Sequence, residues 1–137
     1  MEINREELAW AAGFYDGEGS TGLNKYTTVG KKGKRRGYWK RYPTMTIAQT
    51  GNGEELHRFN FAVGNIGKVY GPYGPYGTNK QNKQSYFQFH VNGFEKVQAV
   101  TAVLWKFMCS AKRNQSEDVL RRYLDQPNYK GELHCVS

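Results

Sequence analysis

The sequence lacks a long apolar run, a cysteine framework and any metal-binding spacing of histidine and cysteine. No stretch approaches the roughly 20 apolar residues of a membrane span, and the first residues do not form a charged and then apolar leader. The two cysteines, Cys109 and Cys135, and the three histidines show no zinc spacing. These absences predict a soluble, intracellular protein without a membrane partner. The 137 residues fit one domain, with a tail over 126–137.

Acidic residues are scarce in the middle of the chain. Between Gly19 and Phe94 there are 12 lysines or arginines but only two acids, Glu54 and Glu55. This stretch therefore carries +10 and the rest of the chain −2, for a formal net charge of +8. A basic surface of this size favours a polyanion, because each neutralised phosphate releases counterions. A solvated basic face that only keeps the protein soluble is the alternative.

Residues 8–20, LAWAAGFYDGEGS, form an apolar helix that leads into two acids. Asn4 and Glu7 make a capping box in front of it, which predicts a helix over 5–15. One face of this helix is nearly bare backbone, because small residues recur there at helical spacing: Ala9, Ala12 and Gly13. Such a face predicts very close packing against another helix.

Two glycines, Gly17 and Gly19, predict the end of this helix, because they relieve the steric limits on φ there. Glu18 then projects from the exit turn. A helix dipole disfavours a carboxylate at its C-terminal end by a few tenths to ~1 kcal/mol, so we expect a positive partner, for which a divalent metal ion is the obvious candidate. For Asp16 a cap or a hydrogen-bond acceptor is favoured, and a metal ligand is the alternative.

The remaining sequence alternates between strand and helix patterns. Alternation of polar and apolar residues predicts strands over 20–28, 42–50 and 85–91. Residues 66–76 contain a repeated Gly-Pro-Tyr, which predicts an edge strand or an extended arm. Helices are predicted over 52–63, 92–107 and 116–125, with a break at 110–115. This order is α+β with an antiparallel sheet. The sheet has one apolar face, and its polar and aromatic face suits a DNA groove.

The run from Ala12 to Gly19, AGFYDGEG, resembles the signature of the LAGLIDADG homing endonucleases. The resemblance implies the α-β-β-α-β-β-α fold, in which the sheet forms a DNA-binding saddle and the helices cover its other face. In that family two motif helices pack across a two-fold or pseudo-two-fold axis. The motif occurs once here, which is typical of the single-motif members that act as homodimers.

The same resemblance implies a metal-dependent phosphodiester hydrolase. Its second motif acid, Glu18, then binds Mg²⁺, with two or three ions shared at the two-fold axis of the dimer. Gln49 and Lys112 match the family's glutamine near the end of the second strand and its lysine before the last helices, which order water and stabilise charge. For Lys112 a phosphate clamp or a surface lysine is the alternative. Residues 51–53 are Gly-Asn-Gly where some members have a further basic residue.

Candidate DNA contacts fall into two groups. A basic, glycine-rich stretch is expected to contact phosphates through Lys31, Lys32, Lys34, Arg35, Arg36, Lys40 and Arg41. Outward strand positions are expected to read bases, namely Asn24, Tyr26, Lys40, Tyr42, Thr44, Thr46, Lys68, Tyr70, Gln88 and His90. An ordinary solvated sheet face is the alternative for each of these strand positions.

Together these features predict a site-specific double-strand DNA endonuclease that cuts a long, near-palindromic target as a homodimer. Two other classes stay open: an intron maturase or other RNA-binding relative that does not cleave, and a transcriptional regulator. A regulator built on this scaffold would have lost the acid. The run Asp16-Gly17-Glu18-Gly19 is present, and this favours the nuclease.

Overall fold

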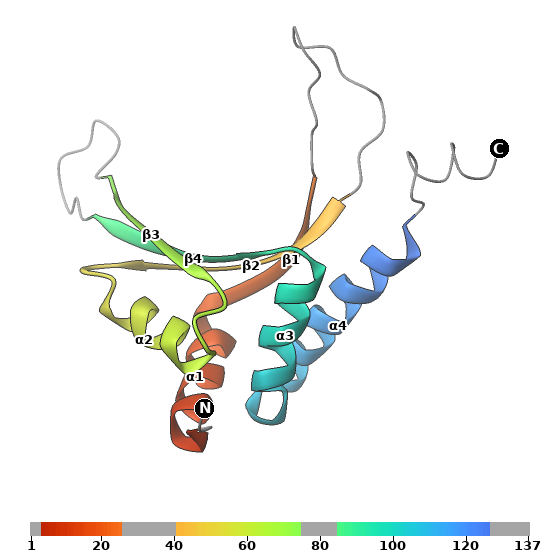
Figure 1. Ribbon diagram of the computed structural model, residues 1–137, viewed down its shortest axis with the longest axis horizontal. Helices are drawn as coiled ribbons and strands as arrows, with labels where there is room; N and C mark the ends of the chain where they lie inside the picture. The colour runs from red at the N-terminus through yellow and green to blue at the C-terminus, as the bar shows by residue number, and fades with distance from the viewer. Residues whose placement is uncertain (1–3, 26–40, 75–84, 127–137) are drawn as a thin grey trace, which may run out of the picture.

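The computed structural model describes residues 4–25, 41–74 and 85–126. A helix, two strands, a second helix, two strands and two final helices follow one another (Figure 1). Their bounds are α1 Arg5–Glu18, β1 Gly19–Lys25, β2 Arg41–Thr50, α2 Glu54–Ala62, β3 Lys68–Tyr73, β4 Tyr86–Asn92, α3 Phe94–Leu104, the 3-10 turn η2 Trp105–Phe107, and α4 Ser110–Asp125. The predicted α+β class and its order of elements are confirmed.

The four strands form one antiparallel sheet in the order β1-β2-β4-β3. β1 and β2 pair as the predicted hairpin, and β3, with its Gly71-Pro72 step, lies at an edge as predicted. Figure 1 shows a curved sheet with the described helices on one side of it. On the opposite side, none of the described elements covers the sheet.

The core lies between the sheet and the helices. Met45 and Ile47 of β2 pair with Val91 and Phe89 of β4, and all four side chains are buried on the helix side. The ring of Phe59 in α2 meets the ring of Phe89 edge-on, with 4.9 Å between centroids. Each such large apolar side chain contributes about 1.5–3 kcal/mol by its burial. The predicted inward positions of β2 and β4 are therefore those that hold the sheet to the helices.

α1 is one turn longer than predicted. It continues through Asp16 and Gly17 to Glu18, and its C-cap, Gly19, has extended backbone angles of φ −93° and ψ 169°. Neither glycine has a positive φ. The expectation that they end the helix through unusual backbone angles is wrong. Glu18 is consequently the last residue of the helix itself.

α4 begins six residues earlier than predicted, at Ser110 and not near residue 116. The polar run at 110–115 is thus the first part of a helix and not a break. Within α4 the apolar Leu124 is 65% exposed, whereas the polar Ser116 is buried. Gln126 is held as well, since its side chain bonds to the backbone N–H and carbonyl of Arg41 at 2.8 and 2.7 Å. The rest of the predicted tail lies outside the described residues.

α2 and α3 begin two residues later than predicted, at Glu54 and Phe94 and not at residues 52 and 92. The N-cap residues are Gly53 and Gly93, each with a positive φ, and neither helix has a side-chain cap from that position. The Asn52 side chain instead accepts the N–H of Glu54 at 3.0 Å. No helix among the described residues combines the length and the apolar character needed to cross a membrane.

Candidate functional site

Glu18 stands at the point where α1 passes into the sheet. Its carboxylate is exposed and makes no hydrogen bond or ion pair with any other residue that the structure describes. The following glycine is required by space, because a Cβ on Gly19 would lie 2.1 Å from Cδ1 of Tyr15. The chain can turn into β1 this tightly only with glycine at that position. The turn leaves the Glu18 carboxylate free at the surface.

The start of α4 meets the end of α1. The last turn of α1 holds two acids and no basic residue, an arrangement that its own dipole disfavours. Asp16 Oδ2 accepts the backbone N–H of Cys109, the N-cap residue of α4, at 3.0 Å. The Lys112 ammonium donates to the carbonyl oxygen of Gly19 at 2.6 Å. The N-terminus of α4 and Lys112 therefore bring positive charge to this helix end, at Asp16 and at the Gly19 carbonyl and not at the Glu18 carboxylate.

A buried hydroxyl cluster joins the same elements one turn deeper. The Tyr15 hydroxyl contacts Thr21 Oγ1, which lies 3.2 Å from Ser116 Oγ. The backbone N–H of Thr21 donates to Gln115 Oε1 at 3.2 Å. Burial raises the pKa of Tyr15 to about 12, against the smaller opposing effect of its hydroxyl partners. α1, β1 and α4 are thus joined by satisfied polar contacts in a setting where an unpaired hydroxyl would be costly.

The raised pKa of Tyr15 predicts a loss of stability at high pH. A group whose folded pKa is raised stabilises the fold fully below its unfolded pKa, near 10, and this contribution is lost as pH rises through about 12. Over that window the unfolding free energy of the wild type should fall by roughly 1.4 kcal/mol per pH unit more steeply than that of Tyr15→Phe. Urea denaturation from pH 9 to 12 measures both slopes. Equal slopes would contradict burial of the neutral phenol.

Gln49 approaches the same end of the sheet from β2. Gly19 pairs with Ile47, and Gln49 lies two residues further along β2, on the same face. There it is opposite Phe87 and half-buried. The three residues predicted to be catalytic, Glu18, Gln49 and Lys112, therefore come from α1, β2 and α4 to one end of the β1-β2 pair.

The outward face of the sheet carries most of the predicted base-reading residues in register. His90 pairs with Thr46 on one side and Lys68 on the other, and Gln88 pairs with Tyr70. Tyr42 and Asn24, which pair with each other, continue this face along the β1-β2 pair, whereas Arg41 lies on the opposite face because successive strand residues alternate. Within the described residues these positions form a continuous polar and aromatic surface.

His90 is tied into this surface by its neighbours. Its Nε2 lies 2.8 Å from Gln88 Oε1, and its ring meets that of Tyr70 edge-on at 5.5 Å between centroids. Partial burial lowers the pKa of His90. A neutral imidazole has one donor and one acceptor nitrogen, which suits a base edge better than a phosphate.

Thr44 departs from the prediction for this face. It points outward with Thr46, but it is 4% exposed between its partners Gly22 and Asn92, so it offers almost no surface to a ligand. The other expected contacts, Tyr26, Lys31, Lys32, Lys34, Arg35, Arg36 and Lys40, lie outside the described residues.

The arrangement of helices and strands is shared with solved protein structures. I-CvuI, in complex with the I-CreI target in 2 mM Mg with the DNA not cleaved, gives a TM-score of 0.62 at 21% identity, over 92% of this chain and 71% of its own. I-TnaI, a homing endonuclease, gives 0.62 at 16%, over 90% and 74%. This chain has the homing endonuclease fold. The LAGLIDADG homing endonuclease I-GzeII in complex with its DNA target gives 0.59 at 15%, over 98% of this chain and 42% of its own.

No family model matches this sequence, and no curated protein matches it. At identities of 15–21% the structural likeness establishes the fold and not the activity. What the site does has to be argued from its own residues.

The small-residue face of α1 differs from the prediction at one position. Ala9 and Gly13 are exposed, but Ala12 is 0% exposed and packs in the core of the chain. Ala12 is therefore not available to a partner helix, and its assignment to the dimer interface is wrong. The exposed stripe continues one turn later at Gly17, at spacings of four residues. On a homing endonuclease fold this stripe runs directly up to Glu18.

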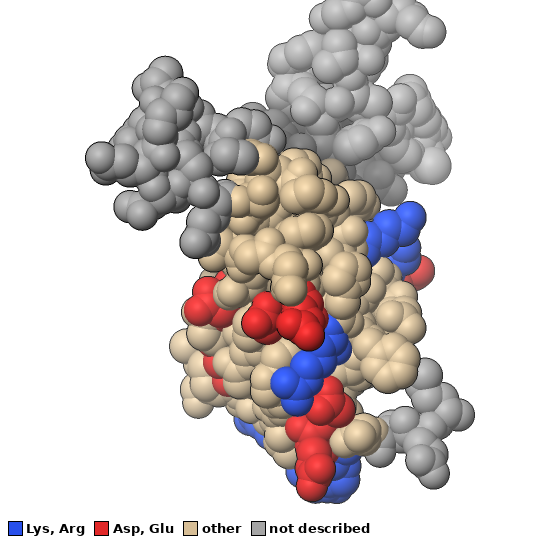
Figure 2. Space-filling view, turned by 90° about the vertical axis from the view of Figure 1, so that its left-hand side faces the viewer, with Lys and Arg blue, Asp and Glu red and all other residues tan. Residues whose placement is uncertain are grey.

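The helix side of the molecule carries charges of both signs. Figure 2 looks at the α2 end and shows acidic and basic side chains side by side below the sheet. Glu7 and Arg58 form an ion pair there, with 2.8 Å between Oε2 and Nη2. Arg121 and Arg122 of α4 likewise form ion pairs with acids one helical turn earlier, Glu117 and Asp118. These charges are balanced locally and do not make a second basic surface.

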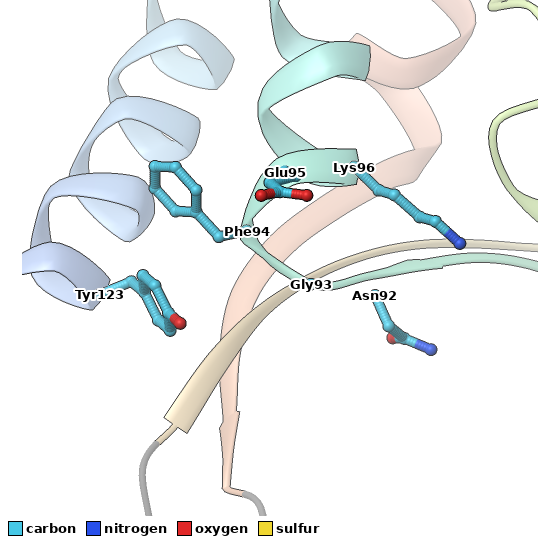
Figure 3. A pocket seen from close by; sticks show the side chains of 6 residues that line it. All are labelled: Asn92, Gly93, Phe94, Glu95, Lys96 and Tyr123. Atoms are coloured by element: carbon cyan, nitrogen blue, oxygen red, sulfur yellow. The ribbon is translucent and has the colours of Figure 1, made fainter. Parts of the chain in front are cut away.

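A shallow depression lies between the start of α3 and the end of α4, away from Glu18. It holds about 330 Å³ and is lined by Asn92, Gly93, Phe94, Glu95, Lys96 and Tyr123. Figure 3 shows the rings of Phe94 and Tyr123 next to each other on its α4 side, where they stack at 5.2 Å between centroids. Glu95 opposes the charge of Lys96, so the depression has no clear preference for an anion.

A divalent ion fits Glu18 only if further ligands come from outside the part of the chain that the structure describes. Within the described residues no group of three or more His, Cys, Asp or Glu side chains could hold a metal ion. Glu18 is nevertheless a free, exposed carboxylate, which is the ligand type that Mg²⁺ prefers. A second copy and a DNA phosphate can supply the missing oxygens.

Proposed function

We propose that this protein is a site-specific double-strand DNA endonuclease that works as a homodimer with Mg²⁺. One observation carries the proposal: on a homing endonuclease fold, Glu18 has an exposed carboxylate with no partner among the described residues, and the carbonyl of the next residue, Gly19, binds the Lys112 ammonium. The basic excess of the sheet and its connections provides the matching affinity for a polyanion.

Glu18 would hold the metal, and Lys112 and Gln49 would act on the phosphate and the water. Bound Mg²⁺ neutralises phosphate charge and lowers the pKa of a bound water. The Lys112 ammonium has three donors, of which Gly19 takes one, so two remain for phosphate oxygens. The Gln49 amide offers both donors and an acceptor and can orient an attacking water.

Two chains would complete the site. We place the interface on the stripe of Ala9, Gly13 and Gly17, where two helix backbones can approach closely. An isologous contact through this stripe brings two copies of Glu18 to the two-fold axis, where they can share two or three Mg²⁺ ions. Such symmetry matches a long, near-palindromic target.

The outward sheet face would read bases, and the basic stretch over 31–41 would contact phosphates. His90, Gln88 and Tyr70 offer donors, acceptors and ring edges on one surface. Structures of I-CvuI with DNA were obtained in the presence of 2 mM Mg and of 2 mM Ca, which supports a divalent ion as the cofactor of this chain.

Cleavage of a randomised DNA library tests the proposal and its metal requirement. Wild-type protein with Mg²⁺ should produce double-strand ends that share one near-palindromic sequence, recovered by sequencing the ends. With EDTA the same sequence should be bound, in a gel shift, and not cut, because the metal's charge neutralisation is absent. Binding without any cleavage in Mg²⁺, or a preference for RNA, would instead indicate a non-cleaving relative.

A further inference from the structure

We propose that Asp16 is a positioning residue, which holds the start of α4 so that Lys112 docks beside Glu18. This inference rests on the proposed function, because it assigns Lys112 to the reaction. The two acids of the motif then have different roles: Glu18 is the metal ligand, and Asp16 is a clamp, which here means a residue that fixes the start of α4.

The bond from Asp16 replaces a cap that α4 lacks. Its N-cap residue, Cys109, has extended backbone angles and no side-chain cap bond of its own. In a capping box a carboxylate accepts the N–H of the N-cap residue. Here Asp16 provides that carboxylate from the neighbouring helix, at 3.0 Å. The first bond within α4 follows at once, from the N–H of Arg113 to the carbonyl of Cys109 at 2.9 Å.

Lys112 makes a second contact between the start of α4 and the end of α1. It is the third residue of α4, and its ammonium reaches Gly19 at 2.6 Å. Asp16 and Gly19 lie on either side of Glu18 in the sequence, so two bonds from one helical turn fix both flanks of the acid. If the start of α4 shifts, Lys112 leaves its place relative to Glu18.

The contacts of the two Asp16 carboxylate oxygens favour a role as a clamp over a role as a metal ligand. Asp16 Oδ2 is occupied by the N–H of Cys109, and Oδ1 is sealed from solvent with no partner among the described residues. The positive end of the α4 dipole stabilises a negative charge at this position. Glu18, in contrast, is exposed and has no partner in the described part of the chain. Asp16 is thus committed to α4, and Glu18 remains for a ligand.

Asp16→Ala and Asp16→Asn test the clamp. At saturating Mg²⁺ and DNA, Asp16→Ala should cut about 10- to 100-fold more slowly, because a misplacement of about 1 Å costs on that order. DNA affinity should stay within about two-fold, since the sheet face is unchanged. Asp16→Asn keeps an acceptor oxygen for Cys109 and should recover most of the rate. If Asp16→Asn is as inactive as Glu18→Gln, Asp16 is a metal ligand and the clamp is wrong.

A double-mutant cycle tests whether Asp16 acts through Lys112. In a Lys112→Met background, Asp16→Ala should slow cleavage by less than about two-fold further, because the side chain that it positions is gone. Independent, multiplying losses would overturn the proposal. Val119→Ala is the matched control, since it loosens the buried side of α4, away from the cap. It should lower Tm and leave the cleavage rate unchanged.

Amide hydrogen exchange tests the clamp without any activity. Asp16→Ala should speed exchange at Cys109 and in the first turn of α4, whereas Glu18→Gln should not. If wild-type protein cuts no DNA, the proposed function fails while this measurement still decides the clamp. Unchanged exchange at Cys109 in Asp16→Ala would overturn the clamp even in an active nuclease.

Discussion

Glu18→Gln is expected to abolish strand cleavage while the protein still dimerises and binds DNA. The substitution keeps the size of the side chain and removes one negative charge from each subunit at the exposed end of α1. Without these charges Mg²⁺ has no adequate ligands, and the loss of several kcal/mol of transition-state stabilisation lowers the rate by at least about 10³-fold. Single-turnover cleavage of the selected site measures the rate, and a gel shift in Ca²⁺ measures affinity.

Glu54→Gln is the matched control for the Glu18 result. It removes the same charge from another exposed acid, in the first turn of α2, which the proposed site does not use. Its cleavage rate should equal that of the wild type. Affinity of Glu18→Gln should be equal or slightly higher, since a negative charge near DNA is removed. Cleavage by Glu18→Gln at the wild-type rate would show that Glu18 is not the metal ligand.

Gly13→Leu should convert the proposed dimer into a folded monomer that no longer cuts both strands. A Cβ at Gly13 meets nothing within 4 Å in the single chain, so the fold accepts the larger residue, and leucine favours a helix more than glycine does. At a close helix contact, each added leucine side chain costs about 1–3 kcal/mol by overpacking, and a symmetric dimer contains two of them. The dimer should therefore weaken at least about 30-fold. Light scattering and the unfolding midpoint measure the two effects separately.

Ala102→Leu controls for the added bulk. It places the same side chain at an exposed position of α3, away from the stripe, and should leave the mass in solution unchanged. A Gly13→Leu variant that remains a dimer would show that the two chains meet elsewhere, or through a face that the stripe does not include.

The sequence predicted those elements that are determined by the pattern of their own residues. β2 and β4 were predictable within one residue, because their buried and outward residues alternate. α2 was predictable within two residues, because its apolar residues recur at helical spacing. The start of α4 was not, since the group that caps it, Asp16, is 93 positions away from Cys109. A polar run such as 110–115 carries no mark of a distant cap, so it was interpreted as a break.

The candidate site was predictable to the extent that the motif defines it. The motif places Glu18 at the end of α1, and its role as a ligand remains a proposal. Spacing alone could not decide which small residues of α1 stay exposed: positions i+3 and i+4 border the same face, and the core takes Ala12 while Gly13 stays outside. The contact of Tyr15 with Thr21 and Ser116 was also missed, because hydroxyl residues carry no pairing signal in one sequence.

The contacts between residues 15–21 and α4 can form only late in protein synthesis, because the two segments lie far apart in the sequence. Thr21 and Ser116 are 95 positions apart, and a ribosome adds roughly 5–20 residues per second, so about 5–20 s separate their synthesis. Throughout that interval the nascent chain carries the acidic motif without the helix that fixes it. A premature stop before α4 would therefore release a product that retains the whole motif and lacks both Lys112 and the helix that carries it.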